Sequence, residues 1–216
     1  MVEAPWSTGF EQGFCDYRLA GGFCYTGDTD ASYSTVEAPV HGGRRAAAFT
    51  ISRDPVGDGR QTRCVREGAL PREARYGAWY YVPAGADNTG NWNLMHFQGG
   101  DDLHHLWDVS MVSADDGSLS LYVISLLSPP PPMQTPPPDV PIGSWFHIEF
   151  RLLRAKDATG EIALYQDGAL IDERTGIVTD DTDFGQWYVG NLSLSNPPGL
   201  PPSTLYVDDV TIRTGP

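Results

Sequence analysis

Short runs of alternating hydrophobic and polar residues cover most of this chain, and the runs end at Gly, Pro, Asp or Asn. Alternation with period two predicts β-strands, whereas helical periodicity is almost absent and confined to short stretches such as 70–74. The eleven clearest strands are predicted at 45–52, 61–67, 77–83, 92–99, 105–113, 118–126, 145–153, 161–166, 169–174, 184–192 and 204–213, with weaker ones near the N-terminus. Regularly spaced short strands are typical of an antiparallel β-sandwich.

Turn signals and one proline-rich stretch separate the strands. Asp-Gly pairs at 116–117 and 167–168 supply the positive φ angles that tight hairpins need. The segment 128–141 contains eight prolines, which cannot pair in a sheet, so we expect a polyproline-type surface loop there. A linker between two domains is the alternative. Because the strands on both sides show the same alternating pattern, we expect a single domain over 1–216.

The alternation also sorts side chains into a core set and an outer set. In the strand at 105–113 it places Trp107 and Val109 in the core, and Leu106 and Asp108 on the opposite face. In the strand at 91–99 it places His96 and Gln98 on one face, close enough to share a ligand. That face is predicted to hold Trp92, Leu94, His96 and Gln98, and the other face Asn91, Asn93, Met95 and Phe97.

A polar groove follows if these strands are neighbours. The strand at 61–67 contributes Arg63 and Glu67 from one face. Guanidinium, imidazole, amide and carboxylate groups together suit sugar hydroxyls and uronate carboxylates. The predicted ligand-binding residues are Glu67, Trp92, His96, Gln98 and Asp108. Trp92 is the candidate for stacking on a sugar ring, since the other strand tryptophans fit a core. The alternative is an ordinary solvated sheet face.

Composition narrows the class of partner. The chain has 216 residues, 40% of them hydrophobic, which is enough for one large folded core. Its net charge of −14 would repel nucleic acid phosphates and anionic lipid, so we expect neither as a partner. No hydrophobic run is long enough for a membrane span. No signal peptide is visible at the start, and we expect a monomer.

The three cysteines bear on the cellular compartment. Cys15 and Cys24 lie close in sequence and would close a small loop as a disulfide, with Cys64 as a buried thiol. The alternative is three buried thiols. The disulfide interpretation fits an exported protein, secreted or on the cell surface.

Acidic residues occur in the first and last segments of the chain. Asp208 and Asp209 interrupt the hydrophobic, β-branched strand at 204–213, where charge is costly unless it is paired or binds a metal. Glu11 stands in a matching position near the N-terminus. We expect the two terminal strands to lie side by side. The alternative to a bound cation is satisfaction by backbone N–H groups or by Arg213.

Together these segments resemble concanavalin A-like jelly rolls, and among them the heparin-lyase-like and alginate-lyase-like polysaccharide lyases. The resemblance runs from about 9 to 212, and it rests on the order of several short motifs. These are Gly-Phe-Glu-x-Gly at 9–13, the Arg/Glu strand at 63–67, Asn-Trp-Asn-Leu-Met-His-Phe-Gln-Gly-Gly at 91–100, Gly-Ser-Trp at 143–145, the hairpin at 160–168, Trp-Tyr-Val-Gly at 187–190 and Val-Asp-Asp-Val at 207–210.

The resemblance implies a fold and a set of roles. It implies a jelly-roll sandwich of two antiparallel sheets, with structural Ca²⁺ held by Glu11, Asp209 and, as the alternate, Asp208. For a lyase it implies His96, Gln98, Arg63 and a late-strand tyrosine as the catalytic set, since β-elimination at a uronate needs carboxylate neutralisation, a base and an acid. Tyr188 is the candidate tyrosine.

Two departures from the family pattern bear on activity. The family order Gln-x-His is exchanged here to His96-Phe97-Gln98, and the family's tyrosine would fall at Asn191 or Leu192, after Tyr188. We therefore expect a noncatalytic polysaccharide-binding or surface-adhesion module. The alternatives are a polysaccharide lyase that cleaves a uronic-acid polymer by β-elimination, and an exported structural domain without a small ligand.

Overall fold

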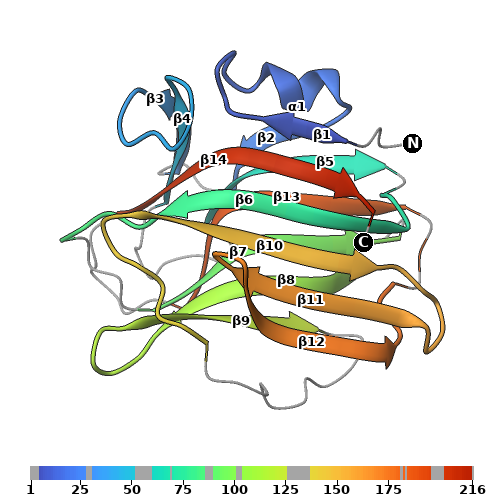
Figure 1. Cartoon of the computed structure of the whole chain (residues 1–216). Coiled ribbons are helices and arrows are strands. Elements are labelled where there is room, and N and C mark those ends of the chain that lie inside the picture. Colours follow the sequence, from blue (N-terminus) through green and yellow to red (C-terminus); the bar gives the residue numbers. More distant parts are fainter. Residues whose placement is uncertain are drawn as a thin grey trace.

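The computed structural model describes residues 5–27, 31–51, 60–68, 70–85, 90–100, 104–125, 137–180, 182, 184–195 and 202–215. These residues form fourteen strands and one short helix (Figure 1). The elements are β1 (Trp6–Thr8), α1 (Cys15–Leu19), β2 (Phe23–Thr26), β3 (Ser32–Val36), β4 (Ala46–Ile51), β5 (Gln61–Gly68), β6 (Glu73–Tyr81), β7 (Asn91–Gly99), β8 (His104–Ser113), β9 (Leu119–Ser125), β10 (Trp145–Leu153), β11 (Gly160–Gln166), β12 (Ala169–Ile177), β13 (Gly185–Ser195) and β14 (Ser203–Thr214).

The strands form two antiparallel sheets that pack face to face, as Figure 1 shows. The larger sheet has the order β12-β11-β10-β6-β14-β4-β3, with β1 added beside β14. The smaller sheet has the order β2-β5-β13-β7-β8-β9. The predicted jelly-roll sandwich is confirmed, and the eleven predicted strands correspond to β4 to β14. The predicted helical stretch at 70–74 is wrong, because β6 already begins at Glu73.

The two ends of the chain lie side by side, as the acidic residues of the terminal segments suggested. Strand β1 pairs antiparallel with β14, so that Trp6 lies opposite Ile212 and Thr8 opposite Val210. No helix in the described part of the chain is long and apolar enough to cross a membrane.

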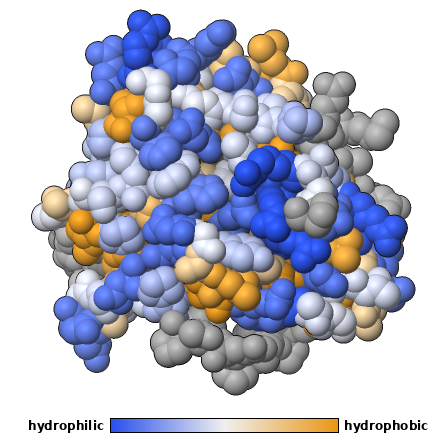
Figure 2. Space-filling model, viewed as in Figure 1, coloured by the Kyte–Doolittle hydropathy of each residue, from blue (hydrophilic) through white to orange (hydrophobic). Residues whose placement is uncertain are grey.

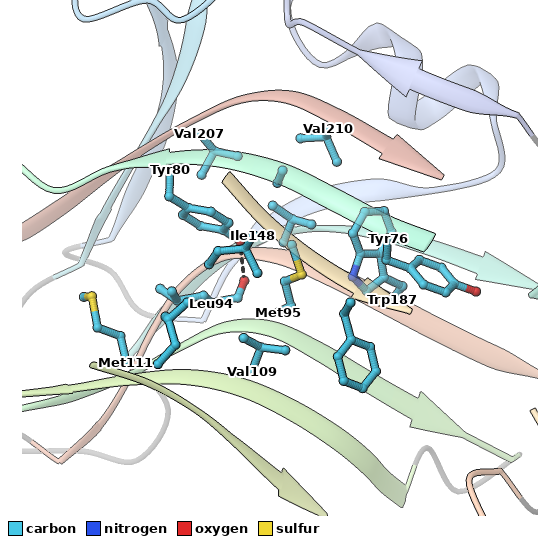
Figure 3. Packing of buried hydrophobic residues seen from close by; sticks show 14 of the residues in the cluster. Tyr76, Tyr80, Leu94, Met95, Val109, Met111, Ile148, Trp187, Val207 and Val210 are labelled. Carbon is cyan, nitrogen blue, oxygen red and sulfur yellow. Dashed lines mark hydrogen bonds between the residues drawn. The ribbon is translucent and has the colours of Figure 1, made fainter. Parts of the chain in front are cut away.

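The core fills the space between the sheets. Figure 3 shows side chains from both sheets meeting there, among them Tyr76, Ile148 and Trp187. Burying one such large side chain stabilises the fold by about 1.5–3 kcal/mol. The hydroxyl of Tyr80 crosses between the sheets and donates to the backbone oxygen of Leu94 at 2.7 Å. This hydrogen bond joins the two sheets at β7, the strand that carries His96.

Two β-bulges change which residues face the core. The pairing of β7 with β8 skips Leu94 on one strand and Leu106 on the other. Both leucines are buried in the core beside residues that also point inward. An extra residue in one strand shifts the alternation beyond it by one position. The predicted face of Leu106 is therefore wrong, and His96 shares its face with Asn93 rather than with Leu94.

A disulfide joins Cys24 on the edge strand β2 to Cys64 on β5. The two residues are register partners, so the sheet pairing itself brings them together. Cys15 is exposed and unpaired. The predicted bond between Cys15 and Cys24 and the predicted free thiol at Cys64 are therefore both wrong, because pairing was set by the sheet rather than by closeness in sequence.

The end of the proline-rich segment is tied to the sandwich. Residues 128–136 of the predicted loop lie outside the described residues. Beyond them, Val140 is buried and its N–H donates to the backbone oxygen of Leu119 at 2.7 Å. Asp139 forms an isolated bridge with Ser120. The last part of the segment therefore pairs with β9 and does not stand off as a surface loop.

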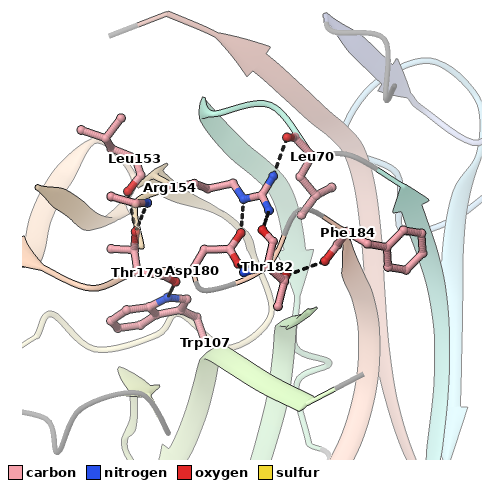
Figure 4. A network of polar contacts seen from close by, with 9 residues as sticks. Leu70, Trp107, Leu153, Arg154, Thr179, Asp180, Thr182 and Phe184 are labelled. Atoms are coloured by element: carbon pink, nitrogen blue, oxygen red, sulfur yellow. Dashed lines mark hydrogen bonds and ion pairs between the residues drawn. The ribbon is translucent and has the colours of Figure 1, made fainter. Parts of the chain in front are cut away.

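A buried polar network holds the connection into β13 (Figure 4). The guanidinium of Arg154 forms an ion pair with Asp180 and donates to the backbone oxygens of Leu70 and Thr182, both at 2.7 Å. Trp107 Nε1 donates to the backbone oxygen of Thr179 at 2.6 Å. These contacts anchor the segment that leads into β13, the strand that carries Tyr188.

The outer face of the larger sheet is mainly hydrophilic. Figure 2 shows that face with hydrophobic residues only in small separate groups. Ion pairs cover part of it, with Arg151 between Glu73 and Glu161, and Glu149 between Arg75 and Arg213. The Glu149 carboxylate is nearly buried between its two arginines, of which Arg213 is exposed. The polar residues predicted to form a site lie on the other sheet.

Candidate functional site

A pocket of about 220 Å³ opens on the outer face of the smaller sheet. It is lined by Tyr25, Gln61, Arg63, Asn93, His96, Gln98, His105, Asp108, Tyr188 and Leu192, which come from β2, β5, β7, β8 and β13. Strand pairing makes these five strands neighbours, as the groove prediction required. Since ligand pockets for drug-sized molecules range over roughly 300–1,000 Å³, this pocket can hold only a smaller group.

His96 and Asp108 form the polar centre of the pocket. They are register partners on β7 and β8, and His96 Nδ1 is hydrogen-bonded to Asp108 Oδ1. Burial lowers the pKa of the His96 imidazole, and the Asp108 carboxylate only partly offsets this. Burial pushes the pKa of Asp108 upward, but hydrogen bonds from His96 and Asn93 outweigh it and leave that pKa lowered. The pair therefore consists of a neutral imidazole and a carboxylate, with the Nε2 lone pair of His96 available.

Arg63 supplies a buried positive charge. Its side chain is 5% exposed, and its guanidinium carbon lies 5.5 Å from the centre of the Tyr188 ring. The Nε atom has no hydrogen-bond partner among the described residues. Burial lowers the pKa of Arg63, while the Tyr25 and Asp108 side chains favour the charged form. A nearly buried guanidinium with an unsatisfied Nε–H group is a strong receptor for a carboxylate.

Tyr188 faces the same pocket. Its hydroxyl lies 2.7 Å from Gln98 Oε1 and is also in hydrogen-bond contact with Gln186 Oε1. The Tyr188 ring centre is 5.2 Å from that of His96. Burial raises the pKa of the phenol well above its ordinary value, so the hydroxyl stays protonated at neutral pH. The structure therefore brings together an imidazole, a guanidinium and a protonated phenol.

Glu67 reaches this group only through another residue. It accepts a hydrogen bond of 2.7 Å from Gln186 Nε2, and Gln186 in turn contacts Tyr188. Glu67 itself lines a separate groove with Trp6 and Arg66. Glu67 lies on the predicted face of its strand. In the structure, however, its carboxylate orients Gln186, and it does not line the pocket.

Trp92 is not a sugar-stacking residue. It is 1% exposed and belongs to the core between the sheets. The pattern placed Trp92 on the face of His96, and the bulge at Leu94 separates them. The prediction was wrong because alternation cannot reveal a bulge.

Several lining residues were missed by sequence reasoning. His105 is exposed, and it lines the pocket beside His96. Asn93 was assigned to the opposite face. Tyr25 comes from a strand near the N-terminus that the pattern marked only weakly. The bulges in β7 and β8 bring Asn93 and His105 to the pocket, and residue type alone does not reveal a bulge.

The acidic residues of the terminal segments lie elsewhere and are satisfied by N–H donors. Asp208 Oδ2 accepts the backbone N–H groups of His41 and Gly42, at 3.0 and 3.1 Å. Asp209 Oδ2 lies 2.7 Å from His41 Nδ1. Glu11 Oε1 accepts two backbone N–H groups, from 44 and 45. The structure thus agrees with the alternative in which backbone N–H groups satisfy these carboxylates. These donors compete with a cation for the same oxygens, and calcium at these carboxylates stays a prediction.

Comparison with known proteins gives a match in fold but none in sequence. No protein-family model matches the chain, and no curated protein matches it. An endo-β-1,4-glucuronan lyase from the fungus Trichoderma reesei is similar, with a TM-score of 0.67, 17% identity and coverage of 89% of this chain and 90% of that one. A variant of the alginate lyase Aly36B in complex with alginate trisaccharide has a TM-score of 0.73 at 9% identity, with 100% of each chain covered. The cellulose-induced protein Cip1 has a TM-score of 0.63 at 15% identity, covering 97% of this chain and 99% of that one.

These similarities establish the fold and not an activity, because all three identities are low. The chain has the jelly-roll architecture of the alginate and glucuronan lyase structures. The family resemblance of the sequence is thus confirmed at the level of the fold.

Proposed function

We propose that the protein is a polysaccharide lyase that cleaves a uronic-acid polymer by β-elimination. The observation that carries the proposal is the convergence of Arg63, the His96–Asp108 pair and Tyr188 on one pocket. The displaced tyrosine had favoured a noncatalytic module. Tyr188 nevertheless reaches the face of His96, which restores the missing acid.

Substrate binding begins with the uronate carboxylate. We assign Arg63 as its partner, since a charge-assisted bond to a buried guanidinium is strong and geometrically specific. Neutralising the carboxylate makes the neighbouring C5 proton more acidic, because the negative charge that develops on deprotonation spreads into the carboxyl group. Gln98 lies at the Tyr188 hydroxyl and offers a further polar contact to the sugar.

The chemistry then needs one base and one acid. His96 Nε2 takes the proton from C5, while Asp108 holds Nδ1–H and stabilises the imidazolium that forms. The electron pair of the C5–H bond forms the C4–C5 double bond as the C4–O4 bond breaks. The Tyr188 hydroxyl gives its proton to the leaving O4. The products are a new reducing end and an unsaturated uronate, and proton exchange with water restores both residues.

The charge of the pocket favours a substrate with one carboxylate per sugar. Among the described lining residues Arg63 is the one permanent cation, and the rest of the chain is strongly acidic. A heavily sulfated polymer would meet net repulsion. We therefore propose an unsulfated polyuronate, such as polyglucuronate or alginate, as the substrate.

The proposal also includes the compartment. The Cys24–Cys64 disulfide persists in oxidising surroundings, which favours a secreted or cell-surface protein. A polysaccharide substrate outside the cell agrees with that location.

The decisive experiment follows the ultraviolet absorbance of the unsaturated uronate during incubation with polyglucuronate, alginate blocks and heparin. We expect absorbance to rise with an unsulfated polymer and to fall by about 10²–10⁴-fold in rate for His96→Ala. His147→Ala is the matched control, because His147 lies on the other sheet and far from the pocket lining. An unchanged rate in His96→Ala, or no absorbance change with any polymer, would refute the lyase.

A noncatalytic glycan-binding module is the second candidate. It is favoured by the tight enclosure of the reacting groups, since His96 is 3% and Tyr188 6% exposed. Calorimetric binding of oligouronates that is lost in Arg63→Met, without any gain in absorbance, would establish binding in place of cleavage.

A further inference from the structure

We propose that His96, His105 and Asp108 bind a divalent transition-metal ion, with Zn²⁺ as the expected one. Among the described residues, these three form a group of His and Asp side chains spaced closely enough to hold one metal ion. One potential ligand atom of each lies within 4.8 Å of the others. The imidazole rings of His96 and His105 have centres 4.4 Å apart.

The bulge in β8 creates this arrangement. His105 and Asp108 are three positions apart, so strict alternation would place them on opposite faces of the sheet. Because Leu106 is the extra residue, both face the pocket, and Asp108 lies opposite His96. The three donors thus come from two paired strands, which is a rigid support for a metal site.

The donor set decides the chemical class of the ion. Two imidazoles and one carboxylate are typical of zinc sites that keep a fourth position open for water or a substrate oxygen. Calcium and magnesium prefer oxygen donors and would leave the imidazoles unused. His96 is buried while His105 is exposed, so an ion has access from the His105 side. On binding, the ion replaces the hydrogen bond as the link between the His96 and Asp108 side chains.

The bound ion would switch the pocket off, a consequence that rests on the proposed lyase function. A neutral imidazole carries one N–H. In the metal-free pocket that hydrogen lies on Nδ1 and the lone pair on Nε2. A metal bound at Nε2 occupies this lone pair, and a metal bound at Nδ1 moves the hydrogen to Nε2, so in either case Nε2 can no longer accept the C5 proton. Asp108 is consumed as a ligand at the same time. We therefore infer inhibition by zinc at the same residues that carry the chemistry.

Metal binding is measured first, without any substrate. Protein stripped with EDTA is titrated with ZnCl₂ by calorimetry, and Co²⁺ is added separately to record visible absorption bands of an ordered low-coordinate site. We expect one ion per chain, with the affinity reduced by at least about tenfold in His105→Ala, because losing a ligand should cost no less than losing a residue that only orients one. His104→Ala and His147→Ala are the controls, since neither residue lines the pocket.

Two results of the binding titrations would overturn the metal site. Equal zinc affinity in wild type and His105→Ala overturns the site, as does a loss of equal size in His104→Ala. Because His105 is exposed, its replacement is expected to leave the melting temperature within a few degrees of wild type; His105→Gln, which keeps the side-chain size, replaces it if His105→Ala does not fold.

Activity is measured second, with each variant compared with its own zinc-free rate. Zinc should suppress the wild-type rate, EDTA should restore it, and His105→Ala should need about tenfold or more zinc for the same suppression. Zinc binding without any lyase activity would overturn the proposed function but not the metal site. Lyase activity with no zinc binding would remove the metal site alone, and activation by zinc would overturn the inhibition.

Discussion

His96 and Asp108 lie directly opposite each other on β7 and β8, and the Asp108 carboxylate accepts the hydrogen of His96 Nδ1. This hydrogen bond fixes the imidazole in the tautomer whose Nε2 atom is free to accept a proton. A carboxylate that orients an imidazole in this way also stabilises the imidazolium formed during proton transfer. The pairing therefore has a chemical consequence that can be measured.

Asp108→Asn should lower kcat on the unsulfated polyuronate by about 10²–10⁴-fold. The amide keeps the shape of the side chain but can present its NH₂ group to His96, which selects the wrong tautomer and removes the stabilising charge. Initial rates from the unsaturated-uronate absorbance measure the effect, with thermal unfolding as a check on folding. A rate within about threefold of wild type would contradict the assigned role.

Tyr188→Phe should also lower kcat, with KM much less affected. The variant keeps the ring that packs near His96 and Arg63 and removes only the hydroxyl that protonates the leaving oxygen. Gln98 and Gln186 lose a donor, so we expect a stability loss of about 1–3 kcal/mol by chemical denaturation. Tyr122→Phe is the control, since Tyr122 is on β9 and not among the lining residues. Equal rates for Tyr188→Phe and wild type would point to another acid.

Arg63→Lys should raise KM by about tenfold or more, although it conserves the charge. Lysine is a compact cation without the planar fork that grips a carboxylate, and it cannot stack on Tyr188 in the same way. The comparison uses saturation curves for wild type, Arg63→Lys and Arg72→Lys, the last being an exposed arginine outside the pocket. If Arg63→Lys behaves like Arg72→Lys, the carboxylate binds elsewhere.

Removing the disulfide should destabilise the fold by about 4 kcal/mol, from the loss of a cross-link that spans 40 residues. Edge strand β2, which carries Tyr25 into the pocket, should loosen with it. Denaturant unfolding of the double variant Cys24→Ala and Cys64→Ala tests this, and Cys15→Ser is the control because that thiol is exposed and unpaired. Equal midpoints for all three proteins would show that the bond adds nothing.

Glu11→Gln should destabilise the protein at neutral pH and not in acid. Backbone N–H groups of Arg44 and Arg45 hold the pKa of Glu11 below its ordinary 4.5. A lowered folded pKa gives stability above the unfolded pKa, and this stability is lost as pH falls through the folded pKa. The gap between the two melting temperatures should therefore close as the pH falls from neutral through the folded pKa of Glu11. A calcium-dependent rise in melting temperature that Asp209→Ala or Glu11→Gln abolishes would instead show a cation at these oxygens.

The sandwich itself could be predicted because alternation is a local consequence of the pleat. The core position of Trp107 and the groove position of Asp108 both follow from it. Each depends on a pattern of hydrophobic residues that is visible within one strand.

The rest depended on long-range geometry. Cys24 pairs with Cys64 because β2 and β5 are neighbours, which no spacing in the sequence reveals. Tyr188 reaches the pocket although it precedes the position expected from the family motif. His105 and Asn93 required knowledge of where a strand carries one extra residue.

Leu94 and Leu106 also bear on how such a site can change through evolution. A residue inserted or deleted beside either leucine would turn His96 or His105 toward the opposite face of the sheet without replacing any residue of the pocket. One codon gained or lost is therefore enough to build or erase this set of reactive groups. Descendants of one ancestral sandwich can then differ in chemistry while their alignable residues stay the same.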